Sequence, residues 1–148
     1  MSVVVVLDTG PLGLLTNPNP TPGPFAIRQW LADVLAAGGR MILPEISDYE
    51  LRREYLRANL IRSLVMLDTL AGQIEYLPLT TAAMRKAAEM WAQVRRVGKP
   101  TAPDHALDGD VIFAAQALLL GPPVVVATAN PAHLARFVPA DDWQNIAP

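Results

Sequence analysis

The order of hydrophobic and polar residues along the chain predicts strands that alternate with helices. Residues 3–7 are four valines and a leucine, a continuous apolar run typical of a strand buried on both faces of a parallel sheet. Shorter apolar runs predict further strands at residues 41–43, 74–79 and 124–127, with residues 143–146 a candidate edge strand.

Helical spacing of apolar residues marks most of the segments between these strands. Residues 25–37 repeat apolar positions with a helical period, and two glycines at 38 and 39 end the pattern. Pro44 opens a helix that runs to about Arg57, because the first helical N–H needs no partner. Further helices are predicted at residues 61–70, from a Thr80 cap to about residue 97, from an Asp108 cap through residues 111–120, and at residues 131–137.

The alternation of strands and helices predicts an α/β fold around a mostly parallel sheet with right-handed connections. Residues 8–11, 18–24 and 98–106 contain the glycines, prolines and polar residues of turns and loops. The sequence shows no internal repeat or linker, so residues 1–148 are predicted to form one domain.

Composition limits the possible chemistry of the protein more than it limits the possible folds. The 148 residues are 51% hydrophobic and 18% charged, with a formal net charge of −2, so no overall basic field indicates a nucleic-acid partner. The absence of cysteine excludes disulfides and thiolate metal sites. The N-terminus lacks the basic region of a signal peptide, and residues 111–120 are too short to cross a bilayer, so a cytoplasmic protein is expected, without membrane association.

Asp8 is the first candidate functional residue. It directly follows the buried strand at residues 3–7, and ligands of open α/β sheets bind at the carboxyl ends of strands. An aspartate in this position can equally cap the following turn through a hydrogen bond to the backbone. The sequence leaves both interpretations open.

Two further groups of acids are candidates. Asp108 and Asp110 stand before a wholly apolar helix, where acids also serve as caps, but two carboxylates so close would repel each other without a cation or a proton. Glu50 lies on the helix after the second strand, among charged neighbours typical of a solvated face. Glu45 competes with it, although its place in the first helical turn is explained by the helix dipole.

Clustered carboxylates without a cysteine or a histidine pair favour Mg²⁺ or Mn²⁺ over zinc. Such a cation can activate water and neutralise a scissile phosphate, so the pattern is compatible with phosphodiester hydrolysis.

Four segments, in this order, resemble the motifs of PIN domains. These are the valine run ending in Asp8 and Thr9, the Glu50–Leu51 pair, Asp110 followed by an apolar, alanine-rich helix, and a closing strand ending in a Thr-x-Asn turn at Thr128 and Asn130. The matches span nearly the whole chain, and its single-domain length is similar to the VapC-like ribonuclease toxins of type II toxin–antitoxin pairs.

This resemblance implies properties that composition and spacing do not. It implies a three-layer α/β/α sandwich, an endoribonuclease that depends on Mg²⁺ or Mn²⁺, a homodimer and a small antitoxin protein as partner. Carried over by position, Asp8, Glu50 and Asp110 would be the catalytic, metal-binding acids. The residues in auxiliary positions would be Asp108, Asn130, Thr9 and Thr128. Asn130 stands where the family often has another acid, which puts a second metal in doubt; Asp104 could compensate.

Basic residues near these acids are candidates for guiding phosphate. Arg52 and Arg53 follow Glu50 closely, and His133 could donate to phosphate or transfer a proton. Solvation of a helix face explains the arginines as well, and packing explains the histidine.

Three other functions are alternatives to the nuclease. A PIN-like module that binds RNA or a partner protein without cutting it is slightly favoured by Asn130, and disfavoured by the three retained acids. A phosphatase with an aspartate nucleophile would need a second acid at position 10, which is glycine. A dinucleotide-binding fold lacks its glycine-rich motif after the first strand.

Overall fold

The computed structural model describes residues 2–97 and 104–148, and no side chain of residues 104–107 is described. In these residues a five-stranded sheet has the order β3-β2-β1-β4-β5, and every pairing is parallel. The strands are β1 (Val4–Leu7), β2 (Arg40–Pro44), β3 (Glu75–Leu77), β4 (Val124–Ala127) and β5 (Ala140–Asp141). The predicted α/β class and parallel sheet are confirmed.

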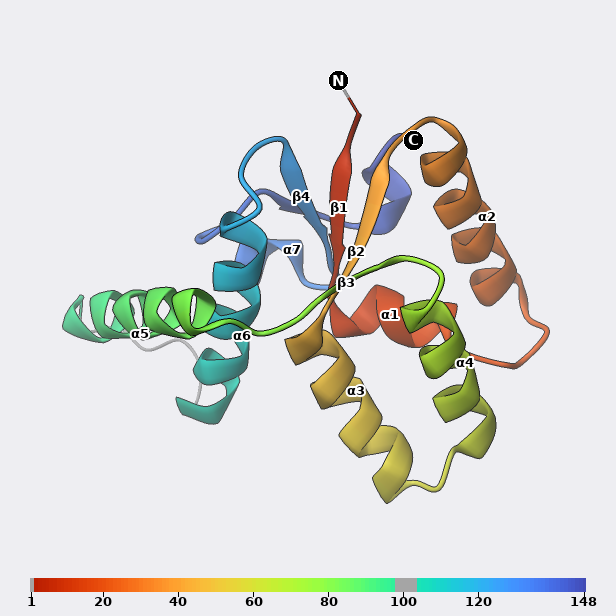
Figure 1. Cartoon of the computed structure of the whole chain (residues 1–148), viewed down its shortest axis with the longest axis horizontal. Coiled ribbons are helices and arrows are strands. Elements are labelled where there is room, and N and C mark those ends of the chain that lie inside the picture. Colours follow the sequence, from red (N-terminus) through yellow and green to blue (C-terminus); the bar gives the residue numbers. More distant parts are fainter. Residues whose placement is uncertain (1, 98–103) are drawn as a thin grey trace.

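Helices cover both faces of this sheet (Figure 1). They are α1 (Thr9–Leu15), α2 (Pro22–Ala36), α3 (Glu45–Arg57), α4 (Ile61–Ala71), α5 (Thr81–Arg96), α6 (Asp104–Leu118) and α7 (Pro131–Leu134), followed by the 3-10 turn η1 (Trp143–Asn145).

The central strand β1 shows why the molecule has three layers. Successive side chains of a strand point to opposite faces, and all four residues of β1 are buried. Val5 and Leu7 pack in a cluster with residues of α1, α2 and α4, whereas Val4 and Val6 pack with residues of α6 and α7. Helix α5 lies outside α6 and is joined to it by a third cluster around Ala87 and Val111. This arrangement confirms the α/β/α sandwich.

Helix α1 was not predicted, because Gly10 and Pro11 indicate a turn. The structure places both residues in the first turn of α1, where backbone N–H groups have no partner within the helix, so a proline there breaks no hydrogen bond. Burial of Leu12 and Leu15 then fixes the helix against the sheet. The same argument applies to α2, which begins at Pro22 instead of residue 25.

Two other boundaries were wrong. Helix α6 begins at Asp104, so Asp108 is not its cap, and residues 104–106 of the predicted loop are helical. The rest of that loop, residues 98–103, lies outside the described residues. The expected edge strand at residues 143–146 is instead a 3-10 turn capped by Asp142, and the edge strand is β5, which precedes it.

Candidate metal centre

Asp8 lies between the end of β1 and the start of α1, at the carboxyl edge of the sheet. Its Oδ1 accepts a hydrogen bond from the Thr9 N–H at 2.8 Å, and its Oδ2 accepts one from the Thr128 hydroxyl at 2.8 Å. Burial raises the pKa of Asp8, the two hydrogen bonds lower it, and the charge of Asp110 raises it. Asp8 therefore caps α1 and also presents a carboxylate at the sheet edge, so the two interpretations of the sequence are compatible.

Glu50 lies in the second turn of α3, which begins directly after β2. Burial raises the pKa of this half-buried side chain, the charge of Asp8 raises it further, Arg53 lowers it and Asp110 raises it. These electrostatic effects require the three carboxylates to lie close to one another. Tyr49 and Arg53 on the same helix are exposed, whereas Glu50 is half-buried and feels the charges of Asp8 and Asp110.

The third acid, Asp110, lies on α6 next to a glycine. A Cβ atom at Gly109 would lie 2.9 Å from Glu50 Oε2, so the missing side chain lets α6 approach the Glu50 carboxylate. Asp110 Oδ2 lies 2.5 Å from Nε2 of His133, the third residue of the short helix α7. Both side chains are about a quarter exposed, at 26% for Asp110 and 28% for His133.

Among the described residues, no three Asp, Glu or His side chains are already positioned to bind one metal ion. The chemistry of the donors nevertheless fits a hard divalent cation, since three acids from separate elements repel one another and offer only oxygen atoms. Asp110 is also engaged with His133. Binding of a cation would therefore require side chains to rotate toward a common point.

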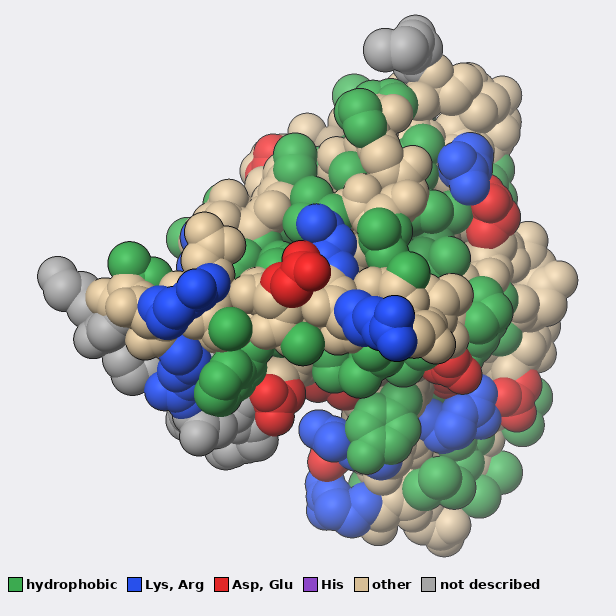
Figure 2. All heavy atoms as spheres, turned by 60° about the vertical axis from the view of Figure 1, so that its left-hand side comes forward, with side chains coloured by type: hydrophobic (Ala, Val, Ile, Leu, Met, Phe, Trp, Pro, Cys, Tyr) green, Lys and Arg blue, Asp and Glu red, His purple; other side chains and the backbone are tan. Residues whose placement is uncertain are grey.

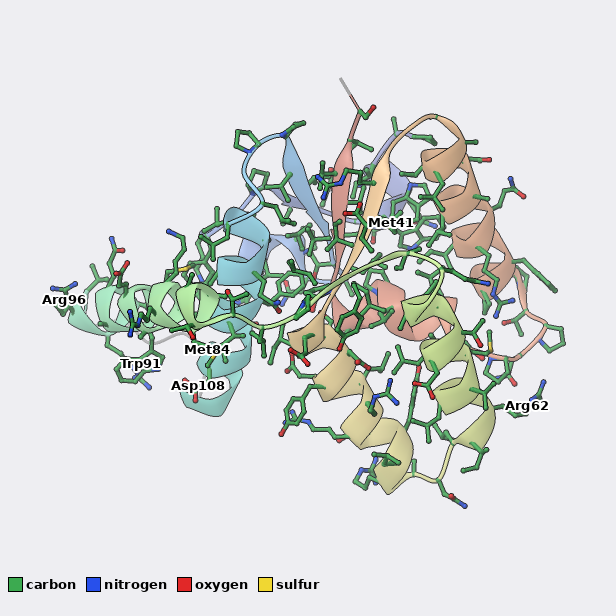
Figure 3. All side chains as sticks on the ribbon, in the orientation of Figure 1. Met41, Arg62, Met84, Trp91, Arg96 and Asp108 are labelled. Atoms are coloured by element: carbon green, nitrogen blue, oxygen red, sulfur yellow. The ribbon has the colours of Figure 1, made fainter. Side chains whose placement is uncertain are left out.

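The auxiliary residues divide into two groups. Thr128 is 1% exposed, and its hydroxyl oxygen also accepts a hydrogen bond from the Asn130 N–H at 3.1 Å. Asn130 itself is exposed, and Thr9 contributes its backbone N–H. Asp108 instead lines a hollow between α5 and α6 together with Met84 and Trp91 (Figure 3). The structure thus places Asp108 on the side of α6 that faces α5.

Two neighbouring acids of α3 have structural partners. Glu45 Oε1 accepts a hydrogen bond from the Leu79 N–H at 2.7 Å, which ties the start of α3 to the segment after β3. Asp48 is buried and accepts hydrogen bonds from the Tyr76 hydroxyl at 2.6 Å and from Arg52 at 3.0 Å. The side chain of Asp104 lies outside the described residues.

The candidate phosphate-guiding residues also differ in position. Arg52 forms ion pairs with Asp48 and Asp68, whereas Arg53 is exposed, packs its guanidinium over Tyr49 at 5.2 Å and acts electrostatically on Glu50. Figure 2 shows the face formed by α5, where basic side chains are interspersed with acidic and hydrophobic ones. Of the two arginines, Arg53 is thus the one whose charge acts on Glu50.

Sequence reasoning missed two features of this centre. His133 was considered for phosphate or for packing, but its observed partner is Asp110, 23 positions away, and no local signal indicates this pairing. Gly109 was not among the candidate residues, although its missing side chain leaves room for the Glu50 carboxylate. A glycine between two acids at a helix start could have indicated a close approach of another element.

No described helix is both long and apolar enough to span a membrane.

A sequence model of the PIN domain matches residues 5–136. VapBC2 from Rickettsia felis, bound to a DNA fragment from their promoter, gives a TM-score of 0.74 at 15% identity, covering 95% of this chain and 98% of that chain. DNA-bound VapBC from Salmonella typhimurium gives 0.73 at 23% identity, with coverage of 95% and 98%.

A third solved structure, FitAcB from Neisseria gonorrhoeae, gives a TM-score of 0.65 at 22% identity, covering 96% of this chain and 99% of that chain. A search of curated protein sequences found no match. The structural likenesses show a shared fold, and the family match covers most of the chain. The chain therefore belongs to the PIN domain family.

Proposed function

We propose that this protein is a metal-dependent endoribonuclease and the toxin of a toxin–antitoxin pair. The observation that carries the proposal is the grouping of Asp8, Glu50 and Asp110 at the carboxyl edge of the sheet. Burial and mutual repulsion raise the pKa values of Asp8 and Glu50. A divalent cation relieves such repulsion, so the grouping supports a site for Mg²⁺ or Mn²⁺.

When bound, the cation would lower the pKa of a water molecule and neutralise charge on the scissile phosphate. The residues of the chain prepare this site. Thr128 and the Thr9 N–H hold the two oxygens of Asp8, and His133 holds Asp110. Arg53, which is exposed and acts on Glu50, is placed to attract the RNA backbone toward an otherwise acidic centre.

Support for a protein partner comes from the surface of α4. Ile61 and Val65 are exposed, at 58% and 59%, and line a hollow of about 370 Å³ with Pro18 and Arg28. Exposed apolar side chains grouped around a hollow are typical of protein interfaces. The fold is shared with structures named VapBC, and we propose a small antitoxin as the partner. A homodimer, which the family resemblance implies, is part of the same proposal.

The direct test is cleavage of a set of structured RNAs by purified protein, with Mg²⁺ or Mn²⁺ and with a chelator. A matched single-stranded DNA serves as the substrate control. The proposal expects cutting of RNA that requires the metal and is lost in Asp110→Asn. If the folded protein binds these RNAs but leaves them intact at every metal concentration, a module that binds without cutting is the better description.

A further inference from the structure

A hollow of about 270 Å³ lies beside the candidate metal centre. Its walls come from helix α1 and the residues just after it, from the turn after β4 and from the start of η1. All three segments follow the carboxyl ends of parallel strands, the edge of a sheet where ligands of α/β proteins bind. None of the acids Asp8, Glu50 and Asp110 lines this hollow, so it is a separate feature of the surface.

Thr128 joins the hollow to the centre. Thr128 is one of the residues that line the hollow, and its hydroxyl donates a hydrogen bond to Asp8. Helix α1 and the turn after β4 approach closely here, since a Cβ atom at Gly10 would lie 2.9 Å from the Cβ of Ala129, and both residues line the hollow. A group bound in the hollow would therefore lie next to whatever the three acids hold.

Trp143 is one of the residues that line the hollow. The ring packs against Trp30, with the centroids 5.6 Å apart and the planes at 52°, and the Trp30 indole N–H donates to the Ile146 carbonyl at 2.8 Å. The segment before it is also held, because Asp142 Oδ1 accepts a hydrogen bond from the Gln144 N–H at 2.9 Å. Trp143 is thus a supported ring at the edge of an otherwise mainly apolar hollow.

Two polar side chains complete the lining. Asn17 uses its Oδ1 to accept from the Asn19 N–H, and its amide nitrogen can donate two hydrogen bonds. Asp142 has one lone pair engaged with Gln144, and an ionised carboxylate offers about four acceptor positions. The hollow therefore combines an aromatic face with a donor and an acceptor.

We propose that this hollow binds an unpaired nucleobase of the RNA, next to the phosphate that the metal centre cleaves. Proteins bind unpaired bases by stacking them on aromatic rings and by hydrogen bonds to their edges. The carboxylate of Asp142 disfavours a phosphate group in the hollow but accepts from the N–H groups of a base. The inference rests on the proposed nuclease function, because it names the part of the substrate that the same site recognises.

The test measures binding apart from cleavage. The ribodinucleotides ApA, CpC, GpG and UpU are titrated into Asp8→Asn protein in a chelator, and the quenching of tryptophan fluorescence is followed. Stacking on Trp143 predicts quenching that Trp143→Phe removes and Trp91→Phe retains, because Trp91 lies on α5 beside a different hollow (Figure 3). Ala129→Leu, at an exposed position, is expected to fill the hollow and weaken dinucleotide binding about 5- to 100-fold.

Base preference provides the second measurement. Asparagine also caps helices, so Asp142→Asn should preserve the fold while it changes which dinucleotide binds best and which base lies beside the cut. If these variants change dinucleotide binding but the protein cleaves no RNA, the result would support nucleobase binding in the hollow and contradict the proposed nuclease function. The inference would be overturned if Ala129→Leu and Asp142→Asn cleaved RNA with the base preference of the wild type and bound dinucleotides with unchanged affinity. It would also be overturned if Ala129→Leu weakened only binding of a protein partner.

Discussion

The hydroxyl of Thr128 donates a hydrogen bond to Asp8 Oδ2 over 2.8 Å and so connects two residues 120 positions apart. The connection follows from the sheet, because β1 and β4 are paired in parallel register and end side by side. Each strand therefore delivers one member of the pair to the same edge. The Thr9 N–H donates a hydrogen bond to the other carboxylate oxygen, Oδ1, so Asp8 is held in one orientation.

Removal of this hydroxyl should weaken cation binding without unfolding the protein. Thr128→Val keeps the shape of the buried side chain, but Asp8 loses one of its two hydrogen bonds. Loss of a group that orients a metal ligand typically costs about 10- to 100-fold in metal affinity. We expect that loss for Mn²⁺ in calorimetry, and near-normal affinity for Thr128→Ser. Equal affinities for the Val and Ser variants would show that the hydroxyl has no orienting role.

A side chain at Gly109 should disturb Glu50. The added Cβ of Gly109→Ala would lie 2.9 Å from Glu50 Oε2, so the carboxylate must move. Alanine favours a helix over glycine by about 1 kcal/mol, so thermal stability should hold while Mn²⁺ affinity falls about tenfold or more. Gly72→Ala is the matched control, because its nearest neighbour would be a carbonyl oxygen 3.6 Å away. Unchanged Mn²⁺ affinity in Gly109→Ala would contradict the close approach of α6 to Glu50.

Glu50→Gln should stabilise the metal-free protein at neutral pH. The pKa of Glu50 is raised above its ordinary value of 4.5, so folding disfavours the charged form. Above the raised pKa the folded protein bears this cost, whereas below pH 4.5 the side chain is protonated in both states and the cost disappears. Because the group is only half-buried, solvent screening keeps the gain small, about 1–2 °C in melting temperature.

Thermal melts in a chelator, at pH values from about 3.5 to 7.5, measure the difference in melting temperature between Glu50→Gln and the wild type, which is expected to be on the order of single degrees. The advantage of Glu50→Gln should shrink as the pH falls, and saturating Mn²⁺ should reverse the ranking, because only the wild type gains binding energy. An advantage of the variant that grows toward acid pH would contradict the account.

A substitution at Tyr76 should lower the stability of the protein without changing its affinity for the metal ion. Its hydroxyl donates to the buried carboxylate of Asp48 over 2.6 Å, and its pKa is raised by burial and by that acid. Tyr76→Phe should cost about 1.5–3 kcal/mol, the range for hydrogen bonds to charged groups. Asp48 and Glu50 are two positions apart on α3 and point to opposite sides. Chemical denaturation should show the loss, and Mn²⁺ calorimetry should show none; a parallel loss of Mn²⁺ affinity would indicate coupling between the two acids.

The sequence predicted the sheet well because burial on both faces leaves an unambiguous apolar pattern. The run at residues 3–7 predicts a central strand, and β1 is that strand. Helix α1 was not predicted because glycine and proline are typical of turns between elements, whereas Gly10 and Pro11 here lie in the first turn of a helix. The start of α6 was misplaced for a related reason, since Asp108 resembles a cap although the helix already begins at Asp104.

The candidate centre was predictable only in part. Asp8 could be placed from its strand, because the end of a buried parallel strand is a defined location. Glu50 could not be separated from its charged neighbours by spacing, and only the resemblance to PIN domains singled it out. The contact of Asp110 with His133 depends on how α6 and α7 pack across the sheet edge, which a local pattern does not record.

The central claim is that Asp8, Glu50 and Asp110 together bind a divalent cation. Calorimetric titration of Mn²⁺ into the wild type and into Asp8→Asn, Glu50→Gln and Asp110→Asn tests it most directly, with Asp108→Asn as the control because that side chain faces α5. The account predicts saturable binding by the wild type and the control, and a loss of about 10²-fold or more in each of the other three, as for removal of a main electrostatic group. Absence of binding by the wild type, or equal binding by all five proteins, would contradict it.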